Sequence, residues 1–217
     1  VDDERMRVKP ISYSSNSYEG TLQNTTNSTI KTKIDSWYEE NLLNRVDSEG
    51  RSYADYLSDG IFCNDRSVDS GTGYLLSPNT FYSSYNRLYS NKSPSFTCDQ
   101  TEDSFTTNIV NGNGSLNYPV SLITADEASM AGGVYNISNT SYYLYTGQSY
   151  WTLSPTFFYF PYMSTYMWFM GTTGDLNRIL SQTSSIGIRP VINLSTEVEI
   201  TGGDGTAINP YVVNLPE

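Results

Sequence analysis

Apolar residues at helical spacing mark the first clear element of the chain. Ile30, Ile34 and Tyr38 fall on one face of a helix, and Ser28 is of a residue type that caps helix N-termini. The pattern therefore predicts an amphipathic helix that begins near Ser28. Residues 1–27 before it are polar and have no such period, so we expect them to form a tether or loosely packed extension.

The middle of the chain is predicted to be mostly irregular. A second short helix is expected over residues 53–57, and residues 58–117 are broken repeatedly by Gly, Ser, Asn and Asp without a strong strand pattern. Regular structure becomes clearer after Pro119. Thr124 and Glu127 have the spacing of a capping box, and Gly132 follows where the short helix would end.

Short apolar runs bounded by turn residues indicate strands in the last third of the chain. These runs span residues 120–123, 188–194, 198–200 and 211–213, with a turn at 202–205. Short helices followed by short strands and long loops predict an α+β fold. We expect residues 28–217 to form a single domain.

The composition is unusual for a soluble chain because charged residues make up only 16% of it. Ser, Thr, Asn, Gly and 19 Tyr take their place. Antibody paratopes use the same set of residues, with Tyr for rigid contact area and Ser, Gly and Asn for adaptable hydrogen bonds. A β-rich surface protein uses it too, so composition leaves both interpretations open.

The net charge of −11 argues against a nucleic-acid partner, because a negative field repels phosphate backbones. No apolar run is long enough to predict a membrane span. Cys63 and Cys98 are the only cysteines. They predict one disulfide if the protein is exported and two buried thiols if it is cytosolic.

The residue types needed for several kinds of catalysis are missing. The chain has no His, which excludes Ser-His-Asp and Cys-His nucleophile systems and leaves no complete tetrahedral metal shell. We therefore expect no cofactor, no metal and no enzymatic activity. An enzyme that uses convergent carboxylates with perturbed pKa values is the remaining catalytic alternative.

Aromatic residues concentrate in residues 156–170, where eight of the fifteen side chains are aromatic. The run does not alternate as a half-buried strand does, and Pro161 follows Phe157 to Phe160 directly. We interpret the segment as an irregular loop that presents aromatic and Met side chains for binding. A fully buried core segment is the alternative.

Three motifs around this segment resemble a known family. Thr124 to Glu127 with Ala131-Gly132-Gly133 comes first, residues 150–155 (YWTLSP) follow, and residues 187–194 (GIRPVINL) close the set. The order resembles C-type-lectin-fold domains related to the formylglycine-generating-enzyme group, especially the variable proteins of diversity-generating retroelements. The resemblance implies a C-type lectin-like fold whose constant motifs flank a diversifiable binding segment at about residues 156–186.

The resemblance implies a ligand-binding domain for receptor recognition or adhesion, displayed on a cell, pilus or phage surface. Its partner would be a protein or glycan on another surface. A structural surface or pilus subunit without a ligand site is the alternative. Trp151, Gly187 and Arg189 would be scaffold. The expected ligand-binding residues are Thr156, Phe157, Tyr159, Phe160, Tyr162, Ser164, Tyr166, Phe169, Thr172, Asp175, Asn177, Arg178, Ile179, Gln182, Thr183 and Ser185.

Overall fold

A computed structural model describes residues 27–71, 79–159, 162, 164–180, 184–206 and 208–214. The predicted N-terminal tether lies almost entirely outside these residues. The described part is a mixed α+β structure with a few short helices and several small antiparallel sheets, which confirms the predicted class.

The first helix, α2 (Thr29–Tyr38), begins where the sequence pattern predicts. The Ser28 hydroxyl accepts a hydrogen bond from the backbone N–H of Lys31 at 3.1 Å. Ile30, Ile34 and Tyr38 are buried on one face of the helix. This face packs against Val120 and neighbouring residues to form one of the two cores.

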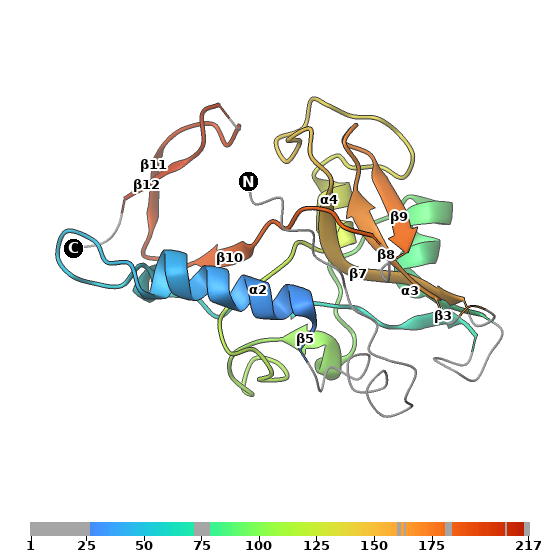
Figure 1. Cartoon of the computed structure of the whole chain (residues 1–217), viewed down its shortest axis with the longest axis horizontal. Helices are drawn as coiled ribbons and strands as arrows, with labels where there is room; N and C mark the ends of the chain where they lie inside the picture. The colour runs from blue at the N-terminus through green and yellow to red at the C-terminus, as the bar shows by residue number, and fades with distance from the viewer. Residues whose placement is uncertain are drawn as a thin grey trace.

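The principal sheet has five antiparallel strands in the order β3-β4-β7-β8-β9 (Figure 1). It contains two long central strands and three shorter ones. Their bounds are β3 (Val68–Ser70), β4 (Asn79–Tyr82), β7 (Tyr150–Tyr159), β8 (Ser164–Met170) and β9 (Leu176–Leu180).

The expectation of an irregular aromatic loop was therefore wrong, because most of the segment forms the β7 and β8 strands. The described part of β7 ends at Tyr159, and Pro161 lies outside the described residues. Pro155 lies inside β7, where the register with β8 shifts on both sides of it. Such an irregularity accommodates a residue without an N–H.

Each face of this sheet packs against its own core. Met167, Phe169 and Ile179 pack against the cluster that contains Ile34. On the other face, Trp168 belongs to a second buried cluster. That cluster comprises Leu88, Ala125, Ala128, Tyr150, Trp168, Met170 and Leu176.

The second core is covered by two short helical segments that lie beside the sheet in Figure 1. One consists of α3 (Ser83–Tyr85) and the π-helical η3 (Asn86–Asn91). The other is α4 (Ala125–Met130), which Thr124 and Glu127 cap reciprocally, as the sequence predicts. Gly132 follows α4 at φ +126°, a conformation that L side chains rarely adopt.

Three smaller sheets complete the structure, and the last of them forms a hairpin set apart from the principal sheet in Figure 1. They are β1-β10-β6, β2-β5 and β11-β12, with β1 (Leu57–Ser58), β2 (Phe62–Cys63), β5 (Ser104–Phe105), β6 (Val120–Ser121), β10 (Val191–Leu194), β11 (Glu199–Gly202) and β12 (Val212–Asn214). Short helical turns also occur at η1 (Glu39–Leu43), η2 (Tyr53–Tyr56) and η4 (Thr101–Asp103).

The predicted disulfide is confirmed, since Cys63 at the end of β2 is bonded to Cys98. The bond joins segments 35 positions apart in a part of the chain that has few long elements. A cross-link of that span restricts the unfolded chain and stabilises the fold by roughly 3–4 kcal/mol on a chain-entropy estimate.

Candidate functional site

Strand register brings aromatic and cationic side chains to one face of the principal sheet. Phe157 of β7 lies opposite Tyr166 of β8, and Trp168 of β8 lies opposite Arg178 of β9. Directly opposed residues share a face, as do residues two apart on one strand. Phe81 of β4 lies opposite Phe157 and extends the same face.

The helical segment after β4 places further rings over this face. Tyr85 lies 4.8 Å from Phe81 and 4.9 Å from Tyr89, measured between ring centroids. Tyr89 in turn lies 4.8 Å from Tyr135, in the loop after α4. We call the connected set the aromatic cluster: Phe81, Tyr85, Tyr89, Tyr135, Phe157, Tyr166 and Trp168.

Arg178 lies within this aromatic cluster. Its guanidinium carbon is 4.9 Å from the ring centroid of Tyr89, 5.2 Å from Tyr85, 5.5 Å from Phe157 and 5.8 Å from Tyr135. A guanidinium at these distances is attracted by each ring face, by about 0.5–2 kcal/mol depending on its contact with water. The rings therefore hold the cation in place from several sides.

The cluster keeps polar groups available for a ligand. The hydroxyls of Tyr85, Tyr89, Tyr135 and Tyr166 form no hydrogen bond with any other residue that the structure describes. Tyr89 is 38% exposed, and the other three tyrosines are half-buried. Ring faces, phenol hydroxyls and one cation together suit the binding of a partner that has both apolar and polar groups.

A second group of tyrosines lies at the connection between β7 and β8. Tyr159 and Tyr162 have ring centroids 5.5 Å apart, and Tyr162 is 73% exposed. The Ser164 hydroxyl donates to the Tyr162 carbonyl at 3.0 Å. This end of the hairpin thus presents at least one large side chain to solvent.

The predicted ligand-binding residues are divided by the fold rather than gathered in one surface. Phe157, Tyr166 and Arg178 lie on the face of the principal sheet that carries the aromatic cluster. Phe169 and Ile179 pack on the first core at the opposite face. Thr156 is completely buried inside β7.

The polar residues of the predicted set lie around the turn between β8 and β9. The Asp175 carboxylate accepts hydrogen bonds from Thr173 at 2.5 Å and from Asn177 at 3.2 Å. Thr172 is exposed in that turn, and Ser185 is half-buried beyond β9. The expected positions Phe160, Gln182 and Thr183 lie outside the described residues.

Sequence reasoning missed the contribution of the segment 81–89. Phe81, Tyr85 and Tyr89 follow one another at intervals of four, which is helical spacing, within a region that was expected to be loop-like. That periodicity is the signal that could have identified them. Tyr135 carries no comparable signal, because a loop places it.

The three motif residues expected to be scaffold make the following contacts. Trp151 is buried, and its backbone N–H donates to the Gly187 carbonyl at 3.1 Å. Arg189 donates from Nη1 to the Leu144 carbonyl at 2.7 Å, and its guanidinium lies 4.7 Å from the Tyr150 ring centroid. These contacts join the start of β7 to the residues before β10.

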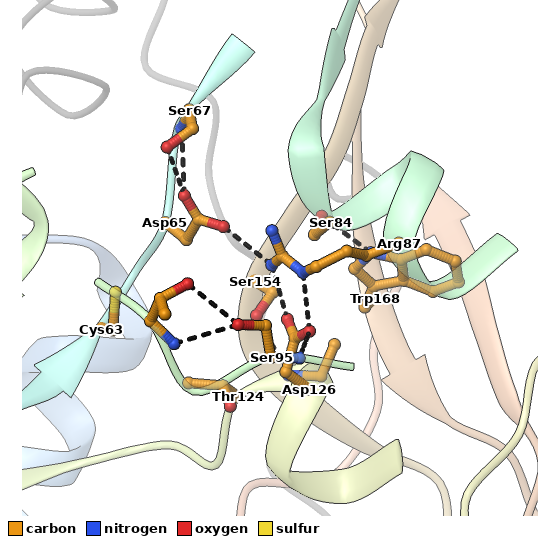
Figure 2. A network of polar contacts seen from close by, with 12 residues as sticks. Cys63, Asp65, Ser67, Ser84, Arg87, Ser95, Thr124, Asp126, Ser154 and Trp168 are labelled. Atoms are coloured by element: carbon orange, nitrogen blue, oxygen red, sulfur yellow. Dashed lines mark hydrogen bonds and ion pairs between the residues drawn. The ribbon is translucent and has the colours of Figure 1, made fainter. Parts of the chain in front are cut away.

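A polar network centred on Arg87 lies on the inner side of the same helical segment (Figure 2). Arg87 donates from Nε and Nη2 to the two carboxylate oxygens of Asp126, at 2.9 and 2.8 Å, and from Nη2 to Asp65 at 2.7 Å. The backbone N–H of Ser95 donates to Asp126 at 2.9 Å. Burial lowers the pKa of Arg87, but the two carboxylates outweigh burial and raise it overall.

The geometry of this network indicates a structural role, because the carboxylates of Asp65 and Asp126 both accept hydrogen bonds from donors within the chain. Asp65 also accepts from the Ser67 hydroxyl at 2.6 Å. Its neighbour Arg66 donates from its backbone N–H and Nε to Asp103. Asp65 and Arg66 thus hold together loops that are distant in sequence.

No protein-family model, curated protein or solved structure matches the chain. In the described part, no helix is both long and apolar enough to cross a membrane. The same residues contain no group of three or more acidic, Cys or His side chains arranged to hold a metal ion.

Proposed function

We propose that this chain is a ligand-recognition domain, used for receptor recognition or adhesion. Its binding surface would comprise the aromatic cluster, Arg178 and the exposed end of the β7–β8 hairpin. The observation that carries the proposal is the position of Arg178 among four rings whose tyrosyl hydroxyls have no partner in the described chain. Aromatic and Arg side chains of this kind dominate the energy of many binding surfaces.

The proposal includes a C-type lectin-like scaffold with a diversifiable surface, because the motifs at 124–133, 150–155 and 187–194 resemble that family. Two contacts support a scaffold role for the last two motifs. Trp151 pairs with Gly187 through the backbone, and Arg189 covers the Tyr150 ring. A nearly identical, Asn-codon-rich copy of the segment encoding 150–190, located beside a reverse-transcriptase gene, would be the genomic sign of diversification.

Surface display on a cell, pilus or virion is part of the same proposal. The Cys63–Cys98 disulfide supports an oxidising compartment, since such bonds form and persist in exported proteins. The scarcity of charged residues and the abundance of Tyr, Ser and Asn support a contact surface rather than a solvated one.

The test is a binding comparison between matched surface variants. Fluorescent tetramers of the wild-type domain would be screened on a panel of cells and immobilised glycans. The double variant Tyr89→Ser/Tyr162→Ser removes two exposed rings, whereas Ile109→Ser/Val110→Ser removes two apolar side chains that are 82% and 88% exposed elsewhere. We expect the tyrosine variant to lose at least about tenfold in binding and the control to bind as the wild type does.

Two outcomes would overturn the proposal. One is equal binding by both double variants, which would place recognition elsewhere. The other is self-assembly that increases with protein concentration together with no binding to any surface in the panel, which would favour a structural subunit. Thermal unfolding of both variants would show that each is folded under the assay conditions.

A further inference from the structure

Arg178 differs from the other arginines of the described chain in its hydrogen bonds. Arg51, Arg66 and Arg87 each pair with carboxylates, while Arg45 and Arg189 donate to backbone carbonyls. The guanidinium of Arg178 has no hydrogen-bond acceptor among the residues that the structure describes. It carries five N–H donors in a planar fork, so this is a large unused capacity.

Ring contacts alone do not satisfy a guanidinium. The cation–π attraction acts on its charge through the ring faces, whereas its N–H groups need lone pairs in their own plane. Arg178 is also half-buried, so it has already lost part of its hydration. A planar anion such as a carboxylate is the group that matches the fork with two parallel hydrogen bonds.

The charge around Arg178 permits an anion despite the overall charge of −11. No residue from 128 to 174 is charged, and this stretch supplies Tyr135, Phe157 and Tyr166. The acidic residue closest to Arg178 in sequence is Asp175, whose carboxylate accepts hydrogen bonds from Thr173 and Asn177. Repulsion from more distant surface acids is screened over about 8–10 Å at ordinary ionic strength.

We propose that Arg178 binds the carboxylate of an acidic saccharide, whose ring stacks on the tyrosines of the aromatic cluster. This inference rests on the proposed function and specifies its ligand class. A saccharide is favoured over an acidic peptide by the tyrosines, because a sugar ring offers apolar C–H faces for the rings and hydroxyls for the phenols. Tyr85, Tyr89 and Tyr135, which supply three of the four rings around Arg178, have hydroxyls without a partner in the described chain.

The experiment compares acidic and neutral saccharides on three forms of the full chain. The probes are 3′-sialyllactose, a hyaluronan tetrasaccharide, neutral lactose and hexaglutamate, each titrated by calorimetry and by NMR chemical shifts. Arg178→Met removes the cation but keeps an unbranched side chain among the rings. Arg45→Met is the matched control, since it changes the net charge equally at an exposed position whose guanidinium donates to the backbone carbonyl of Glu40.

We expect at least one acidic saccharide to bind at least tenfold more tightly than lactose. Arg178→Met should weaken that binding about 10- to 100-fold, the effect of losing a charge-assisted hydrogen bond, while Arg45→Met leaves it unchanged. Binding should also weaken as salt increases, because the pair is partly exposed. Shifts should appear at Tyr85, Tyr89 and Tyr135.

Several results would overturn the inference. They are no binding of either acidic saccharide at millimolar concentration, equal binding of lactose, a preference for hexaglutamate, or binding that Arg178→Met does not affect. The proposed function fails separately, in the tetramer assay. If tetramer binding depends on Tyr89 and Tyr162 but no acidic saccharide binds, the proposed recognition function stands. Only the acidic saccharide is then excluded as its ligand.

Discussion

The indole N–H of Trp168 donates to the hydroxyl of Ser84 at 3.0 Å, and both side chains are completely buried. The Ser84 hydroxyl in turn donates to the carbonyl of Pro155. One small side chain therefore joins α3 to the two central strands of the sheet. It also satisfies a Trp donor that the core would otherwise leave without a partner.

Replacing Ser84 with Ala should destabilise the domain by about 1–3 kcal/mol, because a buried donor and a buried acceptor lose their partner. For a chain of this size, each kcal/mol corresponds to about 2–4 °C in Tm. Calorimetry of Ser84→Ala against Ser90→Ala, an exposed serine of the same helical segment, would measure the difference. Equal Tm values for the two variants would contradict the role assigned to Ser84.

The aromatic run should contain both core and surface positions. Phe158→Ala should cost about 3–5 kcal/mol, since Phe158 is completely buried and truncation leaves a cavity. Tyr162→Ser should stay within about 0.5 kcal/mol because its side chain is mostly exposed. Urea unfolding of both variants provides the comparison, and a severe loss for Tyr162→Ser would mean that its ring is part of the core.

Acid stability should depend on the pair Asp47 and Tyr56. The Tyr56 hydroxyl donates to Asp47, and this bond is the main reason that the Asp47 pKa falls to about 2. Burial, followed by the same bond, raises the pKa of Tyr56 to about 12. Since the folded pKa of Asp47 lies below its ordinary value of 3.8, its contribution is present above that value and is lost as pH falls through about 2.

Tyr56→Phe should therefore move the Asp47 pKa upward and bring acid unfolding to higher pH. NMR titration of the Asp47 side-chain carboxyl carbon would measure the pKa directly. Tyr53→Phe, in the same turn, is the control and should leave it unchanged. An Asp47 pKa that stays near 2 without the Tyr56 hydroxyl would refute this assignment.

The disulfide should be quantitative and stabilising. Thiol titration of the unreduced, unfolded protein should detect no free thiol, because the chain has only Cys63 and Cys98. The double variant Cys63→Ala/Cys98→Ala should lose about 3–4 kcal/mol, the chain-entropy value for a loop of this length. Two reactive thiols in protein purified without reductant would contradict the oxidised state and weaken the proposed exported location.

Local signals in the sequence predicted local structure correctly. Ser28 and the apolar spacing after it fixed the start of α2, and the Thr124–Glu127 spacing fixed α4, since a cap depends only on neighbouring residues. The β7 strand was missed because both of its faces are packed, so its side chains do not alternate between polar and apolar. Its partner β4 pairs with it across more than seventy positions, which no local pattern reveals.

The candidate site was predictable only in part for the same reason. Phe157 and Tyr166 lie within residues 156–170, which the aromatic composition singled out. Arg178 lies outside that run, in the wider segment 156–186 that the family resemblance implied. Tyr85 and Tyr135 reach the same surface from a helical segment and a loop that are distant in sequence. Phe169 and Ile179 were placed in the predicted surface because strand alternation, which directs them to the other core, was not recognised.

The network around Arg87 has a consequence for how the domain folds and unfolds. Arg87 donates to Asp65 and Asp126, which come from separate segments, so the guanidinium is satisfied only after those segments have assembled. The Ser95 backbone N–H donates to Asp126 and ties a further segment to the network. Contacts that close several long loops form late in folding, because the chain loses conformational entropy when the loops close and gains the contact energy only afterwards. Interactions absent from the folding transition state mainly control the rate of unfolding. Arg87 is therefore positioned to slow unfolding and so to lengthen the lifetime of the folded domain.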